Sequence, residues 1–122
     1  MLKIVKKQEL TNEIAVVVGT RPGIIKFSPV LRALQKSKLP FFVIHTGQHY
    51  SYNMDKQFFD DLELPAPRYT NDKVRQEIYH GAQTAEMIRG IEEALLDAKP
   101  KVVIVGGDAN TNLAGALATR KL

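Results

Sequence analysis

The sequence predicts an α/β fold in which helices cover both faces of a doubly wound parallel sheet. Its buried strands are expected in three short, mostly apolar runs, at 14–18, 41–45 and 102–105. The segments between these runs carry apolar residues at helical spacing. Strands that alternate with helices favour right-handed crossovers and parallel pairing, and continuous apolar strands suit a sheet that is buried on both faces.

The first strand, 14–18, is followed directly by Gly19, Thr20 and Arg21. A glycine frees the backbone to turn tightly beside a ligand, so Arg21 would lie at the mouth of the next helix. A guanidinium there can hold a phosphate with a planar fork of donors, reinforced by the partial positive charge of the helix N-terminus. The alternative is an arginine that is only solvated or that pairs weakly with a neighbouring carboxylate.

Two starts are open for the first helix. Ser28 could be its N-cap with Pro29 as the first helical residue, or the helix could begin near Pro22 and bend at Pro29. Either start places apolar residues on one helical face, which indicates a helix packed on the sheet.

The second strand, 41–45, ends in a polar loop that contains Gln48 and His49. Their amide and imidazole groups could hydrogen-bond a sugar or a neighbouring domain. A structural use within the loop fits the sequence equally well.

The middle of the chain predicts a second helix and then an irregular connection. A helix over 53–62 would bury four apolar residues, namely Met54, Phe58, Phe59 and Leu62. Pro65 and Pro67 break this pattern, and a short strand is expected near Arg68. Because 69–81 has no clear periodicity, we expect it to be a mobile connection.

The last part of the chain predicts a helix, a strand and a further helix. Apolar spacing predicts a helix over 83–98, which Pro100 ends. The strand 102–105 follows, and Thr111 is the expected N-cap of the final helix.

Asp108 comes directly after the last strand and two glycines. This position exposes a carboxylate at the edge of a parallel sheet where ligands bind, so Asp108 could act as an acid or a base. Alternatively, it caps the helix that begins near Asn110 by accepting a backbone N–H. In a doubly wound sheet the first and last of these strands are commonly neighbours, which would bring Arg21 and Asp108 into one cleft.

Composition excludes several classes of function. The net charge of +4 is spread along the chain among acidic residues, so nucleic-acid binding is not expected. The chain has no cysteine and no apolar stretch approaching a membrane span, and the basic leader 1–12 is too poor in apolar residues for a signal peptide. His45, His49 and His80 lack the spacing of metal ligands. These features favour a cytoplasmic domain without metal.

Four strings in order carry a resemblance to a known family: Gly19-Thr20-Arg21-Pro22, Lys26-Phe27-Ser28-Pro29-Val30, Thr46-Gly47-Gln48-His49 and Gly107-Asp108-Ala109-Asn110-Thr111. Their spacing closely resembles the N-terminal part of the non-hydrolysing UDP-N-acetylglucosamine 2-epimerases. The resemblance covers 14–122, about the first third of a typical member. It implies an incomplete, Rossmann-like N-terminal lobe, spanning 1–122, of a two-domain glycosyltransferase-B-like fold.

The resemblance also implies a reaction. The family interconverts UDP-GlcNAc and UDP-ManNAc: the C2 proton is removed as UDP leaves, and UDP adds again after reprotonation on the other face. No metal or redox cofactor takes part. By resemblance, Gly19, Thr20 and Arg21 bind the UDP-sugar substrate and Asp108 is catalytic. Three more residues resemble positions that contact a second, regulatory UDP-GlcNAc in bacterial relatives: Gln48, His49 and Gln83.

The chain departs from the family pattern at Gly23, where glutamate is usual, and at Ala109, where threonine is usual. The family's two catalytic glutamates, its catalytic histidine and most uridine contacts correspond to positions beyond 122. We therefore expect an epimerase segment that is inactive alone and that self-associates, for example as a homodimer, through an incomplete sheet edge. One alternative is a stand-alone sugar-nucleotide-binding or regulatory module. Another is a glycosyltransferase lobe, and the motifs disfavour this second alternative.

Overall fold

The computed structural model describes residues 9–49 and 51–122. Most of the predicted basic leader 1–12 therefore lies outside the described residues, as does the side chain of Met54, for which burial is predicted. Within these ranges the elements are β1 Ile14–Val18, α1 Arg21–Lys36, β2 Phe41–His45, α2 Tyr52–Asp61, β3 Tyr69–Thr70, the 3₁₀ turn η1 Val74–Gln76, α3 His80–Ala98, β4 Val102–Ile104 and α4 Asn110–Lys121. No helix in these two ranges is long and apolar enough to cross a membrane.

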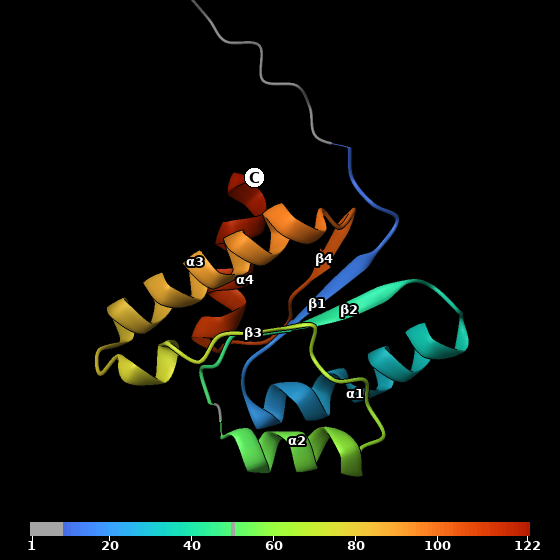
Figure 1. Ribbon diagram of the computed structural model, residues 1–122, viewed down its shortest axis with the longest axis horizontal. Helices are drawn as coiled ribbons and strands as arrows, with labels where there is room; N and C mark the ends of the chain where they lie inside the picture. Colours follow the sequence, from blue (N-terminus) through green and yellow to red (C-terminus); the bar gives the residue numbers. More distant parts are fainter. Residues whose placement is uncertain (1–8, 50) are drawn as a thin grey trace, which may run out of the picture.

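The sheet is parallel throughout and has the order β3-β2-β1-β4. Helices α1 and α2 cover one face, whereas α3 and α4 cover the other (Figure 1). The alternation of side chains along β1 explains the two layers, because Val16 and Val18 pack with the α1 side and Ala15 and Val17 with the α3 and α4 side. All four are 0–2% exposed, so the predicted doubly covered sheet is confirmed.

Helix α1 begins at Arg21, which decides between the two predicted starts. Thr20 is its N-cap, and the Thr20 hydroxyl oxygen accepts the Gly23 N–H at 3.1 Å. The alternative start at Ser28 is wrong, since Pro29 lies inside the helix. Proline removes the N–H that would reach the Ile25 carbonyl, and the Ser28 hydroxyl donates to that carbonyl at 2.8 Å instead.

The segment 69–81 is more regular than its sequence predicts. It contains β3 and η1, and α3 begins at His80, three residues before the predicted start. Long-range bonds account for this order: the Asn71 N–H donates to the His45 carbonyl at 3.2 Å, and the Asn71 amide donates to the Glu86 carbonyl at 3.2 Å. Such partners are far away in sequence and leave no local periodicity.

The predicted boundary of the last helix is also wrong. Helix α4 has Ala109 as its N-cap, so Thr111 lies in its first turn rather than at its cap. The preceding strand β4 ends at Ile104, one residue before its predicted end. Ala109 has a non-helical backbone, with φ −69° and ψ 156°, and the helix starts at the next residue, ahead of the threonine.

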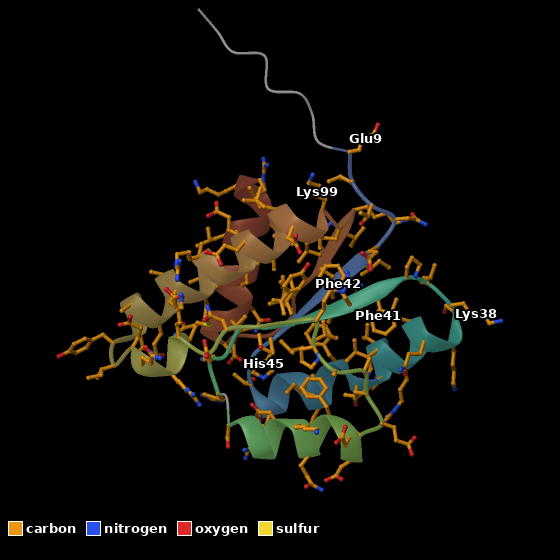
Figure 2. All side chains as sticks on the ribbon, viewed as in Figure 1. Glu9, Lys38, Phe41, Phe42, His45 and Lys99 are labelled. Carbon is orange, nitrogen blue, oxygen red and sulfur yellow. The ribbon has the colours of Figure 1, made fainter. Side chains whose placement is uncertain are left out.

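An ion pair between Arg68 and Glu13 links the segments that precede β3 and β1. The Arg68 guanidinium donates to both carboxylate oxygens of Glu13, at 3.0 and 2.6 Å. It also lies 4.3 Å from the ring centroid of Phe42, which Figure 2 labels on β2. The chain segments that enter β1 and β3 are thereby joined across β2.

This pair should make stability depend on pH. The bonds from Arg68 lower the pKa of Glu13, so the stabilisation is present above the unfolded-state pKa of about 4.5 and is lost as the pH falls through the lower folded-state value. We expect Glu13→Gln to cost about 0.5 kcal/mol at pH 7, since the pair is partly exposed, and to cost less near pH 3. Urea denaturation at both pH values measures this. Glu9→Gln is the control, and a cost that does not change with pH would contradict the assignment.

Candidate functional site

The carboxyl ends of β1, β2 and β4 meet at one edge of the sheet because the strands are parallel. Strand β1 pairs directly with β4, with Val16 opposite Ile104. Arg21 follows β1 as the first residue of α1, and Asp108 follows β4 just before α4. Since α1 and α4 lie on opposite faces of the sheet (Figure 1), their N-termini flank this edge. The predicted neighbourhood of the two strands is therefore confirmed, and Arg21 and Asp108 both follow strands that end at this edge, which we call the rim.

Gly19 lies where the exit of β1, the exit of β2 and the start of α4 meet. A Cβ at this position would overlap the hydroxyl oxygens of Thr46 and Thr111. These two hydroxyls bond each other at 2.8 Å, and both residues are 1–2% exposed. The glycine after β1 therefore serves close packing between the exit of β2 and the start of α4.

Gln48 connects the β2 exit loop to α4. Its side-chain oxygen accepts the Thr111 backbone N–H at 2.9 Å and the Thr111 hydroxyl at 2.7 Å. The N-cap residue Ala109 has no side chain that could satisfy this N–H, so Gln48 supplies the cap from the β2 exit loop. The structural use of Gln48 is thus realised, and its regulatory role stays a prediction.

The other two predicted regulatory residues lie on separate elements. The His49 side chain is exposed, and its backbone N–H donates to the Gly19 carbonyl at 2.8 Å. Gln83, in the first turn of α3, donates its amide to the Glu77 carbonyl at 2.8 Å. The His80 ring and the Asn110 amide lie 3.3 Å apart, which joins the start of α3 to the start of α4.

Asp108 is exposed at the turn between β4 and α4. Gly107 has a φ of 122°, a conformation that favours glycine, and the Gly106 N–H donates to the Asn112 side chain at 3.0 Å. In the described part of the chain, the cap on the Thr111 N–H comes from Gln48 and none is made by Asp108. The capping alternative for Asp108 is therefore wrong.

A buried carboxylate that the sequence analysis missed lies behind Arg21. The side chain of Asp55, in the first turn of α2, is 3% exposed, and its Oδ1 lies 3.7 Å from Arg21 Nε. Its Oδ2 accepts the Ser51 N–H at 3.1 Å and lies 3.6 Å from His45 Nε2. A signal was present in the sequence, because Asp55 shares a helical face with Phe59 and Leu62.

His45 is buried at the end of β2, on the side of the sheet that α1 and α2 cover (Figure 2). Its Nδ1 accepts the Gly47 N–H at 3.0 Å, so the neutral ring carries its proton on Nε2, toward Asp55. Burial lowers the pKa of His45, and the negative charge of Asp55 opposes this shift only in part. The ring is therefore neutral at pH 7.

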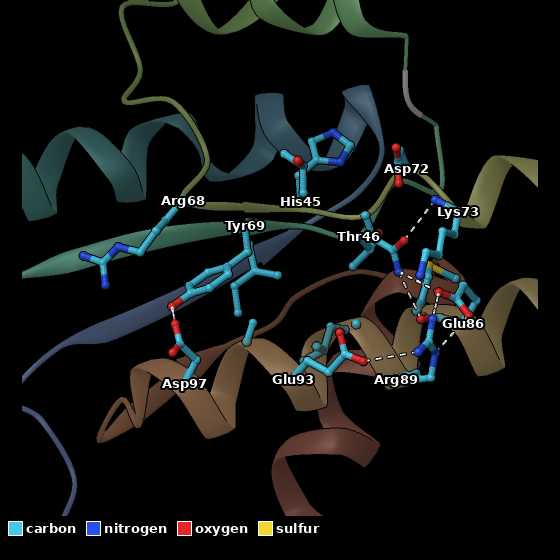
Figure 3. A pocket seen from close by; sticks show the side chains of 17 residues that line it. His45, Thr46, Arg68, Tyr69, Asp72, Lys73, Glu86, Arg89, Glu93 and Asp97 are labelled. Atoms are coloured by element: carbon cyan, nitrogen blue, oxygen red, sulfur yellow. Dashed lines mark hydrogen bonds and ion pairs between the residues drawn. The ribbon is translucent and has the colours of Figure 1, made fainter.

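A cavity of about 500 Å³ opens between β3 and α3 and includes neither Arg21 nor Asp108. Figure 3 shows Arg89 paired with Glu86 and Glu93, and Tyr69 bonded to Asp97, along its lining. Arg89 bonds Glu86 at 2.9 Å and Glu93 at 3.2 Å, and the Tyr69 hydroxyl donates to Asp97 at 2.6 Å. The bond from Arg89 lowers the pKa of Glu86. This cavity thus borders the β2 exit at His45 and Thr46 and is not lined by the two predicted rim residues. Within 9–49 and 51–122 no three potential metal ligands cluster.

Comparison with known proteins decides the family. The family model described as UDP-N-acetylglucosamine 2-epimerase matches residues 32–122. The chain belongs to this family. The UDP-N-acetylglucosamine 2-epimerase of Methanocaldococcus jannaschii is 52% identical over 110 residues, which cover 90% of this chain and 30% of that protein. The enzyme of the same name from Methanococcus maripaludis is 53% identical, with 90% of this chain and 29% of that protein covered.

Comparison with solved structures also gives the 2-epimerase family. A crystal structure of the Methanocaldococcus jannaschii UDP-GlcNAc 2-epimerase, in complex with UDP-GlcNAc and UDP, matches with a TM-score of 0.81 and 50% identity. The match covers 89% of this chain and 30% of that one. The predicted family and the Rossmann-like, glycosyltransferase-B-like architecture are confirmed. This chain spans about 30% of the length of these epimerases.

Proposed function

We propose that this chain forms the N-terminal lobe of a UDP-GlcNAc 2-epimerase site and holds the diphosphate of the UDP-sugar at the rim of β1 and β4. The observation that carries the proposal is that Arg21 and Asp108 follow two adjacent parallel strands at the same edge of the sheet, each beside a helix N-terminus. The match to an epimerase described in complex with UDP-GlcNAc and UDP supports this class of ligand.

The two side chains have the chemistry that epimerisation at C2 needs. A base must remove the C2 proton while the bond from C1 to the diphosphate oxygen breaks, and UDP leaves with the electron pair. We assign the proton transfer to the exposed carboxylate of Asp108. Arg21, Gly19 and Thr20, with the N-terminal dipole of α1, stabilise the charge of the leaving diphosphate. Return of UDP after protonation on the other face of C2 gives UDP-ManNAc.

We expect this chain alone to bind UDP-GlcNAc without converting it to UDP-ManNAc. Glycine at 23 and alanine at 109 leave out the carboxylate and the hydroxyl that the resemblance places there. Incubation of this chain with UDP-GlcNAc is expected to give no UDP-ManNAc, and turnover like that of a full-length relative would contradict this. The chain has no cysteine that would require an oxidising compartment, and we propose that it acts in the cytoplasm.

Calorimetry with UDP tests the binding role of Arg21. We expect saturable binding that Arg21→Ala weakens by about 10-fold to 100-fold, because a charge-assisted bond contributes roughly 1.5–3 kcal/mol. Arg120→Ala is the matched control, since Arg120 is exposed near the C-terminal end of α4 and far along the helix from the rim. Absence of saturable heat at millimolar UDP, or equal affinity of the two variants, would refute the role.

We also propose that the chain self-associates through β4 and α4. Strand β4 lies at the edge of the sheet, and Val102 is 45% exposed although it is apolar. On α4, Leu113 and Leu117 are 53% and 40% exposed. Unpaired strand groups beside apolar surface favour a second copy of the chain, so light scattering should show dimers or larger species that Leu113→Lys reduces. A clean monomer at high concentration would contradict this proposal.

A further inference from the structure

We propose that Asp55 is a positioning residue that fixes the Arg21 guanidinium at the rim of the sheet, with the neutral ring of His45 behind it. The inference rests on the proposed function of Arg21 in binding the diphosphate. Asp55 comes from α2, which neither supplies a rim residue nor carries one of the four motifs. Its role is therefore to act through Arg21 and not on the nucleotide.

The geometry places the carboxylate on the inner side of the arginine. Asp55 Oδ1 lies 3.7 Å from Arg21 Nε, and the carboxylate is 3% exposed whereas the arginine side chain is 41% exposed. The arginine thus spans from a buried anion to the surface of the rim. A guanidinium that pairs with a buried carboxylate has fewer accessible rotamers than a solvated one.

Two neighbours of the Asp55 carboxylate stabilise a negative charge there. The Ser51 N–H donates to Oδ2, and the N-terminus of α2 adds its partial positive charge. His45 presents a neutral Nε2–H at 3.6 Å, because its Nδ1 is occupied by the Gly47 N–H. A neutral histidine does not compete with Arg21 as a countercharge. A buried carboxylate needs such a countercharge, and Arg21 Nε provides it at 3.7 Å, although solvent screens part of the attraction because the arginine side chain is 41% exposed.

Loss of the Asp55 charge and loss of Arg21 positioning are expected to change the UDP affinity in opposite directions. Removal of a negative charge near a phosphate site raises the local potential and should tighten UDP binding. Loss of positioning instead makes UDP order a mobile arginine, whose rotamer freedom is then lost on binding. We therefore expect Asp55→Asn, which keeps the shape of the side chain, to weaken UDP binding about fivefold to tenfold.

The experiment combines calorimetry and NMR on the full chain. UDP affinity is measured for wild type, Asp55→Asn, Arg21→Ala and the double variant, with Asp60→Asn as the control because Asp60 is an exposed carboxylate on the same helix. Asp55→Asn should weaken binding in the wild type and have no further effect with Arg21→Ala. Equal or tighter binding by a folded Asp55→Asn chain, or additive effects, would overturn the proposal.

A second readout does not need UDP. The Nε–H bond of Arg21 should have an NMR order parameter above about 0.7 in the wild type and below about 0.6 in Asp55→Asn. An arginine that is already mobile in the wild type overturns the proposal, even if Asp55→Asn fails to fold. If the wild type does not bind UDP yet holds Arg21 rigid through Asp55, the proposed function fails and the positioning stands.

Discussion

Replacement of Gly19 by alanine should lower the free energy of unfolding by about 3 kcal/mol or more, enough to unfold much of a small domain. The added methyl would overlap the hydroxyl oxygens of Thr46 and Thr111. Neither oxygen is the end of a flexible surface side chain: both residues are buried, bonded to each other and tied to Gln48. To relieve the overlap, the β2 exit and α4 would have to move away from residue 19, and this movement would break the hydrogen bonds among Thr46, Thr111 and Gln48.

Urea denaturation followed by circular dichroism measures the effect. Gly81→Ala is the matched control, because a Cβ at Gly81 meets nothing within 4 Å of it and the residue lies in the first turn of α3. Alanine there should be neutral or stabilise by up to about 1 kcal/mol. A Gly19→Ala chain within about 0.5 kcal/mol of wild type would show that the packing at the β1 exit is looser than the structure has it.

The second large effect concerns Asp108. In a chimera that joins this segment to the remainder of a full-length epimerase, Asp108→Asn should lower kcat by about 1,000-fold, since asparagine keeps the shape but cannot take a proton. Formation of UDP-ManNAc and exchange of the C2 proton with solvent deuterium measure turnover and proton transfer separately. Both should fall together if Asp108 moves the proton.

A carboxylate away from the rim provides the control for this variant. Asp72 is exposed on the β3 side of the sheet, so Asp72→Asn should leave kcat of the chimera within about twofold. If Asp108→Asn raises KM and leaves kcat unchanged, Asp108 binds the substrate and another group transfers the proton.

The buried strands could be predicted from the sequence because two-sided burial leaves an uninterrupted apolar run. The bounds of β1 and β2 agree with the predicted runs 14–18 and 41–45. Helix α1 was harder, because Ser28-Pro29 has the form of a helix start. Its continuation through Pro29 depends on the serine hydroxyl, which takes over the Ile25 carbonyl.

The rim could be predicted in part. Parallel topology alone brings Arg21 and Asp108 to one edge, and this needs only the order of the strands. The bond between Gln48 and Thr111 joins residues 63 positions apart and has no local pattern. Asp55 gave a signal through its spacing to Phe59, but a carboxylate at one position of an apolar helical face is compatible with the solvated edge of that face. Only its packing against His45 shows that it is buried.

The proposal that the β1 and β4 rim holds the diphosphate is tested most directly by a titration of the chain with UDP, followed by ¹H–¹⁵N NMR. If the β1 and β4 rim holds the diphosphate, the backbone amides of 19–23 and 106–111 should shift together and saturate with one dissociation constant. Saturable shifts that leave both segments unchanged, or that move only one of them, would contradict the account.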